Sequence, residues 1–256
     1  MTEACAAVIR ATGLAKRYPP HVDALTGVSL AVGRGEFVAV LGPSGAGKTT
    51  LFRCLTGLTA PDAGVVSVDG QELTRLRGRR LRVARREVAL IFQQFNLVRR
   101  LSALQNVLAG RLAFTPTWRV LLRRFTYADR QLALRGLDTV GLLDKAYTRA
   151  DQLSGGQQQR VAIARALAQD ARVILADEPV ASLDPEAAAT VLDSLRAAAA
   201  AGVAVVASLH QVHLAGVYAD RIVALRDGRI VEDAPAAQVD ARTLETIYGK
   251  NDGASA

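Results

Sequence analysis

FVAVLGPSGAGKT, residues 37–49, is the stretch that decides the fold of this chain. Its first residues are apolar, as in a buried strand, and a glycine-rich loop then leads into a helical pattern from Thr50 onward. Because glycine lacks a Cβ atom, backbone N–H groups of such a loop can turn inward around phosphate oxygens. A helix that starts there also points the positive end of its dipole at the anion. The stretch therefore predicts a strand, a phosphate-binding loop and a helix, in that order.

Two side chains at the end of the loop supply chemistry that backbone N–H groups cannot. Lys48 can reach the β- and γ-phosphates of a nucleoside triphosphate, and the Thr49 hydroxyl is a suitable ligand for Mg²⁺. The alternative, a glycine-rich turn before an ordinary helix, does not account for the complete motif. The residues expected to hold the nucleotide here are Gly42, Pro43, Ser44, Gly45, Ala46, Gly47, Lys48, Thr49 and Thr50.

A carboxylate pair, Asp177 and Glu178, follows a second dense apolar strand at 173–176. Adjacent residues leave the end of a strand in different directions, so one carboxylate can hold the metal while the other holds water. We expect Asp177 to bind Mg²⁺ and Glu178 to act as the general base of phosphoryl transfer. The alternative is a solvated turn, which the phosphate loop upstream makes the weaker interpretation.

The stretch LSGGQ, residues 153–157, predicts a second anion-binding helix start. Ser154 is a favourable N-cap, and Gly155 and Gly156 free the backbone before a helix that continues from Gln157 to Ala168. A capped surface helix is the alternative, and it explains Ser154. It gives no reason for two glycines in the first turn, each of which costs a helix about 1 kcal/mol.

The remaining pattern predicts an α/β protein with a helical insertion. Strands are expected at 6–11, 28–32, 37–41, 65–68, 88–92, 173–176 and 203–207. Helical periodicity replaces strand signals from residue 93 to about residue 160. Asp184-Pro185 starts a further helix and Gly202 stops it, which completes a strand, helix, strand unit of a parallel sheet.

The amino-acid composition excludes few classes of function. The 256 residues are 50% hydrophobic, which indicates a globular chain, and 32 basic against 24 acidic residues leave a formal charge of +8. That charge suits nucleic acid, an anionic membrane or an anionic ligand alike. No export signal is expected at the start, and the apolar run 197–209 is shorter than the ~20 residues of a membrane span. Cys5 and Cys54 indicate two reduced, structural thiols.

These motifs, in this order, resemble those of the ATP-binding subunit of an ABC transporter over nearly the whole chain. Tyr18 resembles the aromatic residue that stacks on adenine, and Gln93 the glutamine between the core and the helical subdomain. His210 resembles the switch histidine near the γ-phosphate, and Ser182-Leu183-Asp184 the loop that crosses the dimer. In isolation, Tyr18 could be a surface aromatic, Gln93 a strand-end polar residue and His210 a core histidine.

The resemblance implies an α/β P-loop NTPase fold of the ABC ATPase type. Such a fold has a mostly parallel core sheet, an N-terminal antiparallel β subdomain and an inserted α-helical subdomain. It implies one ABC ATPase domain over 1–256, with the core at 1–94 and 166–250 and the helical subdomain, which carries LSGGQ, at 95–165.

The resemblance also implies an ATP-driven clamp of two copies packed head to tail, with ATP and Mg²⁺ bound between them. The catalytic residues would be Lys48, Gln93, Glu178 and His210, and the metal ligands Thr49, Gln93 and Asp177. The second copy would add Ser154 and Gly156 to each ATP, and Tyr18, Gly155, Gln157 and Asp184 complete the nucleotide-binding set.

Closer similarity to bacterial phosphonate importers suggests the cargo. It rests on IFQQFNL at 91–97, GRLAFTPTW at 110–118, ADEPVASLDP at 176–185 and LHQV at 209–212. His213 departs from that family, in which an acidic residue is expected. The similarity implies uptake of phosphonates or related phosphorus oxyanions at the cytoplasmic face of the bacterial inner membrane. Transmembrane permease subunits would be direct partners and a periplasmic phosphonate-binding protein an indirect one, with no nucleic acid.

Other functions stay open at this point. The same engine could serve an amino-acid importer or a lipid-extracting transporter. A soluble ABC ATPase of nucleic-acid maintenance would suit the +8 charge, but the chain has no sustained heptads and no stacking aromatic residues among the arginines between Arg75 and Arg86.

Two surface features also permit alternatives. The arginines between Arg75 and Arg86 are expected to form a solvated helix face, with a docking surface or a lipid contact as the alternatives. The segment 118–125 is expected to pack its apolar side chains, Trp118, Leu121, Leu122 and Phe125, against its own subdomain. Its arginines would then face outward, near the membrane partner.

Overall fold

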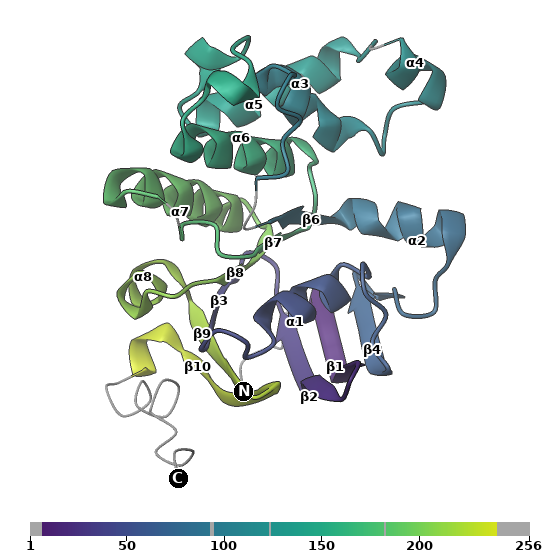
Figure 1. Cartoon of the computed structure of the whole chain (residues 1–256), viewed down its shortest axis with the longest axis vertical. Helices are drawn as coiled ribbons and strands as arrows, with labels where there is room; N and C mark the ends of the chain where they lie inside the picture. Colours follow the sequence, from purple (N-terminus) through teal and green to yellow (C-terminus); the bar gives the residue numbers. More distant parts are fainter. Residues whose placement is uncertain (1–6, 93–94, 123, 182, 240–256) are drawn as a thin grey trace.

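The computed structural model describes residues 7–92, 95–122, 124–181 and 183–239, whose strands form two sheets (Figure 1). The predictions made for Gln93, Ser182 and Cys5 lie outside the described residues. Among the residues that are described, no helix is long and apolar enough to cross a bilayer.

The larger sheet has the strand order β10-β9-β3-β8-β7-β6. Its members are β3 (Phe37–Leu41), β6 (Val88–Ile91), β7 (Val173–Ala176), β8 (Ala204–Ser208), β9 (Arg221–Arg226) and β10 (Arg229–Pro235). Strand β3 pairs in parallel with β8 and β9, and β7 pairs in parallel with β6 and β8. Only the β9–β10 pair within this sheet is antiparallel. The prediction of a mostly parallel core sheet is confirmed.

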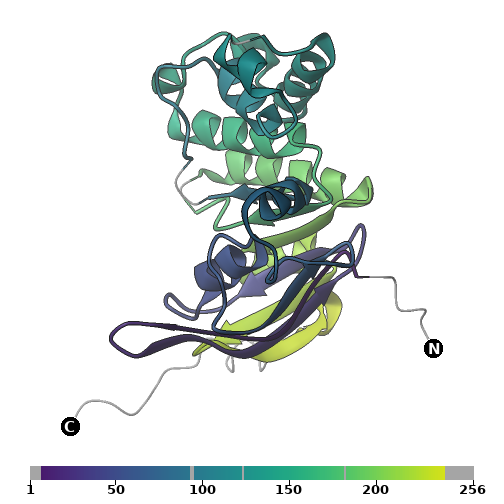
Figure 2. The ribbon, with the colours of Figure 1, turned by 90° about the vertical axis from the view of Figure 1, so that its right-hand side faces the viewer.

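The smaller sheet is antiparallel and has the order β2-β1-β4-β5. Its strands are β1 (Ile9–Tyr18), β2 (Val22–Val32), β4 (Ala63–Val68) and β5 (Gln71–Glu72). Strands β1 and β2 form a long hairpin that extends beyond the rest of the molecule (Figure 2). Both strands are longer than predicted. The register shifts near Gly13, whose φ is 60°, and this shift interrupts the two-residue alternation of buried side chains on which the predicted bounds depend.

Two hydrophobic clusters cover the two faces of the larger sheet. Along β3, Phe37, Ala39 and Leu41 belong to the cluster that α7 (Pro185–Ala200) and α8 (Val212–Tyr218) share. The alternate residues Val38 and Val40 belong to the cluster formed with α1 (Lys48–Leu55) and the smaller sheet. The sheet is therefore buried on both sides, as its continuous apolar strands require.

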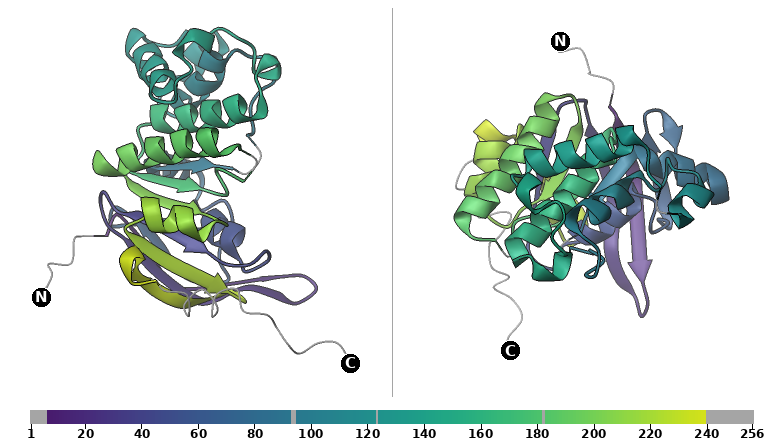
Figure 3. Two further views of the ribbon diagram at one scale, coloured as in Figure 1. Left: turned by 90° about the vertical axis from the view of Figure 1, so that its left-hand side faces the viewer. Right: turned by 90° about the horizontal axis from the view of Figure 1, so that it is seen from above.

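Helices α3 (Ala103–Leu108), α5 (Tyr127–Thr139) and α6 (Gly155–Ala168) stack beyond α7 (Figures 1 and 3). Helices α2 (Gly78–Ala84) and α4 (Thr117–Leu121) lie on the right-hand side of Figure 1. Short 3₁₀ turns connect these elements: η1 (Arg85–Glu87), η2 (Ala109–Arg111), η3 (Leu143–Lys145), η4 (Ala150–Gln152) and η5 (Ala236–Gln238).

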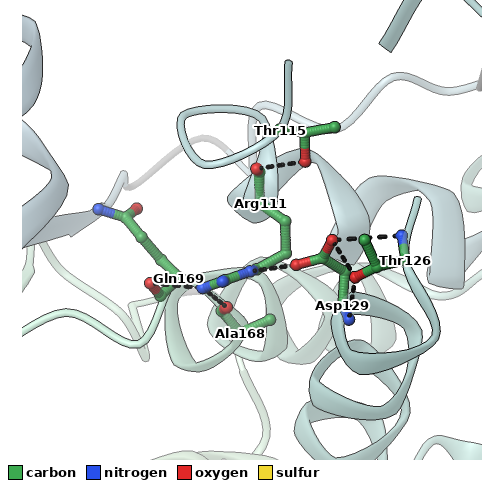
Figure 4. Close-up of polar contacts among 6 residues, drawn as sticks. All are labelled: Arg111, Thr115, Thr126, Asp129, Ala168 and Gln169. Carbon is green, nitrogen blue, oxygen red and sulfur yellow. Dashed lines mark hydrogen bonds and ion pairs between the residues drawn. The ribbon is translucent and has the colours of Figure 1, made fainter. Parts of the chain in front are cut away.

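Arg111 fixes the C-terminal end of α6 to the other helices (Figure 4). Its guanidinium donates to the backbone carbonyls of Ala168 and Gln169 at 3.3 and 3.2 Å and pairs with Asp129 Oδ1 at 2.9 Å. The Asp129 carboxylate also accepts from the Thr126 hydroxyl, which caps α5. A cation at the negative end of α6, neutralised by a carboxylate at the positive end of α5, suits both helix dipoles.

Both surface expectations need correction in part. Trp118, Leu121 and Leu122 are 56%, 79% and 60% exposed, so the prediction that they pack inward was wrong, and only Phe125 packs against the core. Helix α4 is little more than one helical turn long, which is too short to bury one face against its neighbours. The arginines from Arg75 to Arg82 are exposed as predicted, whereas Arg85 and Arg86 are half-buried because the chain turns inward there to enter β6.

Candidate nucleotide site

The loop between β3 and α1 is held by two glycines that no other residue could replace. Gly42 has a φ of 151°, and a Cβ atom there would lie 2.1 Å from the Leu225 carbonyl oxygen. Gly47 has a φ of 105°, and its Cβ atom would lie 2.3 Å from the Ala24 carbonyl oxygen. Gly45, with a φ of 82°, faces open space within 4 Å. The loop is thus fixed at both ends and open in the middle, which suits a cradle for an anion.

Lys48 turns back onto this loop. It is 5% exposed, and its Nζ donates to the Gly42 carbonyl at 2.7 Å and to the Pro43 carbonyl at 3.0 Å. Burial lowers the pKa of Lys48, and the negative charges of Glu178 and Asp177 oppose that shift. A buried ammonium beside an open loop is suited to exchange its carbonyl partners for phosphate oxygens.

Two of the predicted metal ligands, Thr49 at the start of α1 and Asp177 just after β7, meet in one place. Thr49 and Asp177 line the same cavity of about 330 Å³, together with Asn96 and Arg53. In the described part of the chain, no group of three or more His, Cys, Asp and Glu side chains could hold a metal by itself. One hydroxyl and one carboxylate fit Mg²⁺ when phosphates and water supply its other ligands, which is how nucleotide-bound Mg²⁺ is usually held. Gln93, the third predicted ligand, lies outside the described residues.

The carboxyl ends of β7 and β8 bring the predicted base and histidine together. Glu178 Oε1 lies 2.6 Å from His210 Nε2. Glu178 has a left-handed backbone with a φ of 51°, an uncommon conformation for a non-glycine residue. Because β7 and β8 are parallel neighbours, both residues lie at the same edge of the sheet as the phosphate loop.

Tyr18 ends β1 at the tip of the β1–β2 hairpin, where it pairs with Val22. The same hairpin touches the phosphate loop, because the Ala24 carbonyl faces Gly47. The half-buried Tyr18 ring lies 5.6 Å from Lys16 Nζ. Tyr18 thus lies on the hairpin that contacts the phosphate loop, and its stacking on a base stays a prediction.

The second predicted anion site, at the start of α6, is built differently. Ser154 and Gln157 form a capping box, in which Ser154 Oγ accepts from the Gln157 N–H at 3.3 Å and Gln157 Oε1 accepts from the Ser154 N–H at 3.1 Å. A Cβ atom at Gly155 or Gly156 would meet its nearest side chains at 3.5 to 3.9 Å, which is ordinary contact. Packing within the described chain therefore gives no reason for glycine at either position.

The two helix starts predicted to bind anions belong to opposite faces of the core sheet. Helix α1 packs in the cluster with the smaller sheet, and α6 packs in the cluster with α7 (Figure 1). Asp184 is exposed and caps α7, where its Oδ1 accepts from the Ala187 N–H at 2.9 Å. The preceding Leu183 lies against Gly156, so Asp184 and the LSGGQ segment share one surface.

Three residues of the site escape sequence reasoning. The buried Ser208 bonds to both Asp177 and Glu178, and Gln159 Nε2 donates to the Pro179 carbonyl at 2.8 Å. Arg165 Nη1 donates to the Asn96 carbonyl at 2.8 Å, which ties α6 to the segment after Gln93. A serine at the end of an otherwise apolar strand was the available signal for the first. Gln159 and Arg165 lie in α6, and the spacing of polar residues along this helix does not distinguish them from residues that face solvent.

A nucleoside triphosphate fits this arrangement, since the loop, a buried lysine, a hydroxyl and carboxylates converge at the carboxyl edge of a parallel sheet. The fold and the site thus define an α/β nucleotide-binding protein of the P-loop class. Residues 25–181 match the family model described as ABC transporter. The chain belongs to the ABC transporter family and is an ABC ATPase.

Curated relatives and solved structures agree with this assignment. The chain is 52% identical to the hypophosphite import ATP-binding protein HtxD of Stutzerimonas stutzeri, over 88% of this chain but only 66% of that protein. It is 47% identical to the phosphonates import ATP-binding protein PhnC 1 of Halalkalibacterium halodurans, over 95% of each chain. The ATP-binding cassette MJ0796, in a dimeric structure with ADP and Pi, superposes with a TM-score of 0.78 at 33% identity, over 89% of this chain and 98% of that one.

Proposed function

We propose that this protein is the ATP-hydrolysing subunit of an importer for phosphonates or related phosphorus oxyanions. It would act peripherally at the cytoplasmic face of the bacterial inner membrane. The observation that carries the proposal is near full-length similarity to phosphonate and hypophosphite import ATP-binding proteins, combined with a complete set of phosphate-binding and carboxylate residues at one sheet edge. One domain over 1–256, divided as expected from the sequence, would contain both the core and the helical subdomain.

Within one subunit, each residue has a part in ATP hydrolysis. The loop N–H groups and Lys48 would bind the phosphates, and Tyr18 would stack on the adenine. Thr49, Asp177 and Gln93 would hold Mg²⁺, which supplies charge neutralisation for the phosphates when it is bound. Glu178 would hold the attacking water and take its proton, with His210 fixing the carboxylate and reaching the γ-phosphate.

A second copy, packed head to tail, would complete the site. The start of α6 presents two glycines that its own chain does not crowd, which is the geometry an approaching ligand from outside requires. Ser154, Gly155, Gly156 and Gln157 would then contact the ATP of the other subunit, and Asp184 would cross between them. The dimeric state of the similar cassette MJ0796 supports this arrangement.

A groove between α2, β6 and α6 is our candidate for the permease contact. It holds about 460 Å³, and its lining includes the apolar side chains of Leu90, Leu112 and Ala166. Arg82, Arg85, Arg86 and Arg165 also line it. A permease segment with an apolar face and acidic side chains would suit a groove of this mixed lining.

Reconstitution with the permease and binding protein tests the function directly. ATP turnover in proteoliposomes should rise several-fold when methylphosphonate and binding protein are both present. Glu178→Gln in the same vesicles is the control, because it removes hydrolysis without removing the permease. Stimulation by an amino acid instead, or by no phosphorus oxyanion at all, would refute the proposed cargo while leaving the ATPase assignment intact.

Hypophosphite is a second candidate cargo within the same chemical class. The specific observation is the 52% identity to HtxD, which exceeds the identity to PhnC 1. The same vesicles, titrated separately with methylphosphonate and hypophosphite, distinguish the two by the concentration that gives half-maximal stimulation.

A further inference from the structure

Ser208, the last residue of β8, occupies a position that no motif describes. Its hydroxyl donates to Asp177 Oδ1 at 2.9 Å and accepts from the Glu178 N–H at 2.7 Å. The residue has no exposed surface. One buried hydroxyl thus links the expected metal ligand to the expected general base.

The pairing of the strands explains this position. Ala176 at the end of β7 lies opposite Ala207 in β8, so the next residues, Asp177 and Ser208, lie side by side at the carboxyl ends of the two strands. On its other side Ser208 pairs with Val40 of β3, close to the start of the phosphate loop. A serine at this point of the central strand therefore lies between the loop and the carboxylates.

A serine hydroxyl has a single proton, and here that proton goes to Asp177 Oδ1. The bond restrains the rotation of a carboxylate that is only 7% exposed and that lines the same cavity as Thr49. A carboxylate that is held before the cation arrives loses less rotational freedom on binding it.

The second bond of Ser208 acts on Glu178. By accepting from the Glu178 N–H, the hydroxyl supports a backbone conformation with a φ of 51° that few glutamates adopt. His210, two residues further along the same chain segment, contacts the Glu178 carboxylate at 2.6 Å. The end of β8 thereby holds the backbone and the side chain of the same residue.

We propose that Ser208 is a positioning residue that aligns the Asp177 carboxylate for the Mg²⁺ of bound nucleotide and sets the orientation of Glu178. The inference rests on the metal and base roles proposed above for Asp177 and Glu178, and does not depend on the cargo. Ser208 touches neither substrate nor metal in this scheme, and acts through its two neighbours.

The test measures metal binding apart from turnover. Mn²⁺ binding to the purified protein with a non-hydrolysable ATP analogue is followed by electron paramagnetic resonance, alongside kcat and the affinity for ATP in EDTA. Ser208→Ala should weaken Mn²⁺ binding and lower kcat about tenfold each, the loss typical of one hydrogen bond to a charged group. ATP affinity in EDTA should change less than twofold. Ser208→Thr, which keeps the hydroxyl, should restore most of both losses.

Matched variants make every outcome decisive. Ser194→Ala removes another buried serine, in α7, whose hydroxyl donates to the carbonyls of Thr190 and Thr139, away from the nucleotide site, and should change neither measurement. If Ser208→Ala does not fold, Ser208→Cys keeps the shape with a weak donor and should still weaken Mn²⁺ binding. Unchanged Mn²⁺ binding in folded Ser208→Ala or Ser208→Cys overturns the proposal when Asp177→Asn does weaken it. If Asp177→Asn has no effect either, the metal site itself is wrongly assigned.

Discussion

Helices α1 and α6 both begin beside glycine residues, yet the chain treats the two starts in opposite ways. At α1 the glycines are forced by crowding, since Cβ atoms at Gly42 and Gly47 would collide with backbone carbonyls. At α6 the glycines are uncrowded, and the orphan N–H groups of the first turn are partly satisfied by the Ser154 capping box. The start of α1 is therefore enclosed by its own chain, whereas the start of α6 is exposed.

This difference indicates which of the two helix starts has its binding partners within one chain. The phosphate loop has its lysine, hydroxyl and carboxylates around it within one chain. The start of α6 has an exposed Ser154 and shares its surface with the Asp184 carboxylate, while Arg111 anchors its opposite end (Figure 4). A rigid helix with an open, glycine-bearing start is suited to bind something that belongs to another molecule.

The largest expected effect distinguishes the starts of α1 and α6, because variants at the two positions should differ in whether they still bind ATP. Lys48→Ala should lower both ATP affinity and turnover by about a hundredfold or more, because it removes the cation that binds the phosphates. Gly156→Asp should abolish turnover to a similar degree while ATP affinity of the monomer stays within about twofold, since an acidic residue suits a helix start but repels an incoming phosphate. Equilibrium binding and phosphate release measure the two. Loss of ATP binding in monomeric Gly156→Asp would contradict the distinction.

The next prediction concerns the closed state. Glu178→Gln should retain ATP binding and reduce turnover by about a hundredfold or more, because an amide cannot accept the proton from water. The ATP-bound dimer should then persist in size-exclusion chromatography, and combining Glu178→Gln with Gly156→Asp should dissolve it. Turnover close to that of the unmodified protein would remove Glu178 from the assigned role.

The free energy of unfolding, measured without nucleotide, should also distinguish the starts of α1 and α6. Gly47→Ala should lower the free energy of unfolding by about 1–3 kcal/mol, because it forces a Cβ atom against the Ala24 carbonyl at a positive φ. Gly156→Ala should leave that free energy unchanged or raise it by up to about 1 kcal/mol, through better helix propensity. Urea unfolding followed by circular dichroism gives both values. Equal destabilisation would mean that Gly156 is structural after all.

A comparable effect, which depends on pH, concerns the anchored end of α6. Burial tends to raise the pKa of Asp129, but hydrogen bonds from Thr126 and Arg111 outweigh it, so the pKa of Asp129 is lowered. A lowered folded-state pKa contributes stability above the unfolded pKa, near 3.9, and that contribution is lost as the pH falls through the folded value.

Asp129→Asn should therefore cost about 1.5–3 kcal/mol at pH 7, the scale of a hydrogen bond to a charged group. The difference from the unmodified protein should shrink below about pH 4. Urea unfolding at several pH values tests this, with Asp144→Asn, a carboxylate of the η3 turn, as a control that should show no such trend. A cost that is the same at every pH would mean that the charge of Asp129 is not what holds Arg111.

Local sequence was sufficient for some elements, although β9 and β10 were not predicted. The strands 37–41 and 173–176 are observed with the predicted bounds, and Ser154 and Asp184 cap their helices as expected. Cys54 is buried in α1, and burial raises the pKa of its thiol to about 11, in agreement with a structural role. These features depend on periodicity and capping, which act over a few residues.

Reasoning failed where burial depends on neighbours far away in sequence. Trp118, Leu121 and Leu122 have an apolar pattern, but no element of the described fold covers α4, so the pattern did not predict burial. Nothing in the sequence pattern indicates that Arg111 joins α6 to α5. Neither outcome is encoded by spacing, because both depend on which elements pack together.

The sequence alone determined the chemistry of this protein: a glycine loop with Lys48 and Thr49, the Asp177-Glu178 pair and the LSGGQ helix start identify an ABC ATPase. Only the tertiary structure decided how these parts are related. Parallel pairing of β7 with β8 places Ser208 beside Asp177, and the two faces of the sheet separate α1 from α6. The physical reason is that residue types and short-range periodicity define what a segment can do, whereas strand register and layer packing define which segments meet.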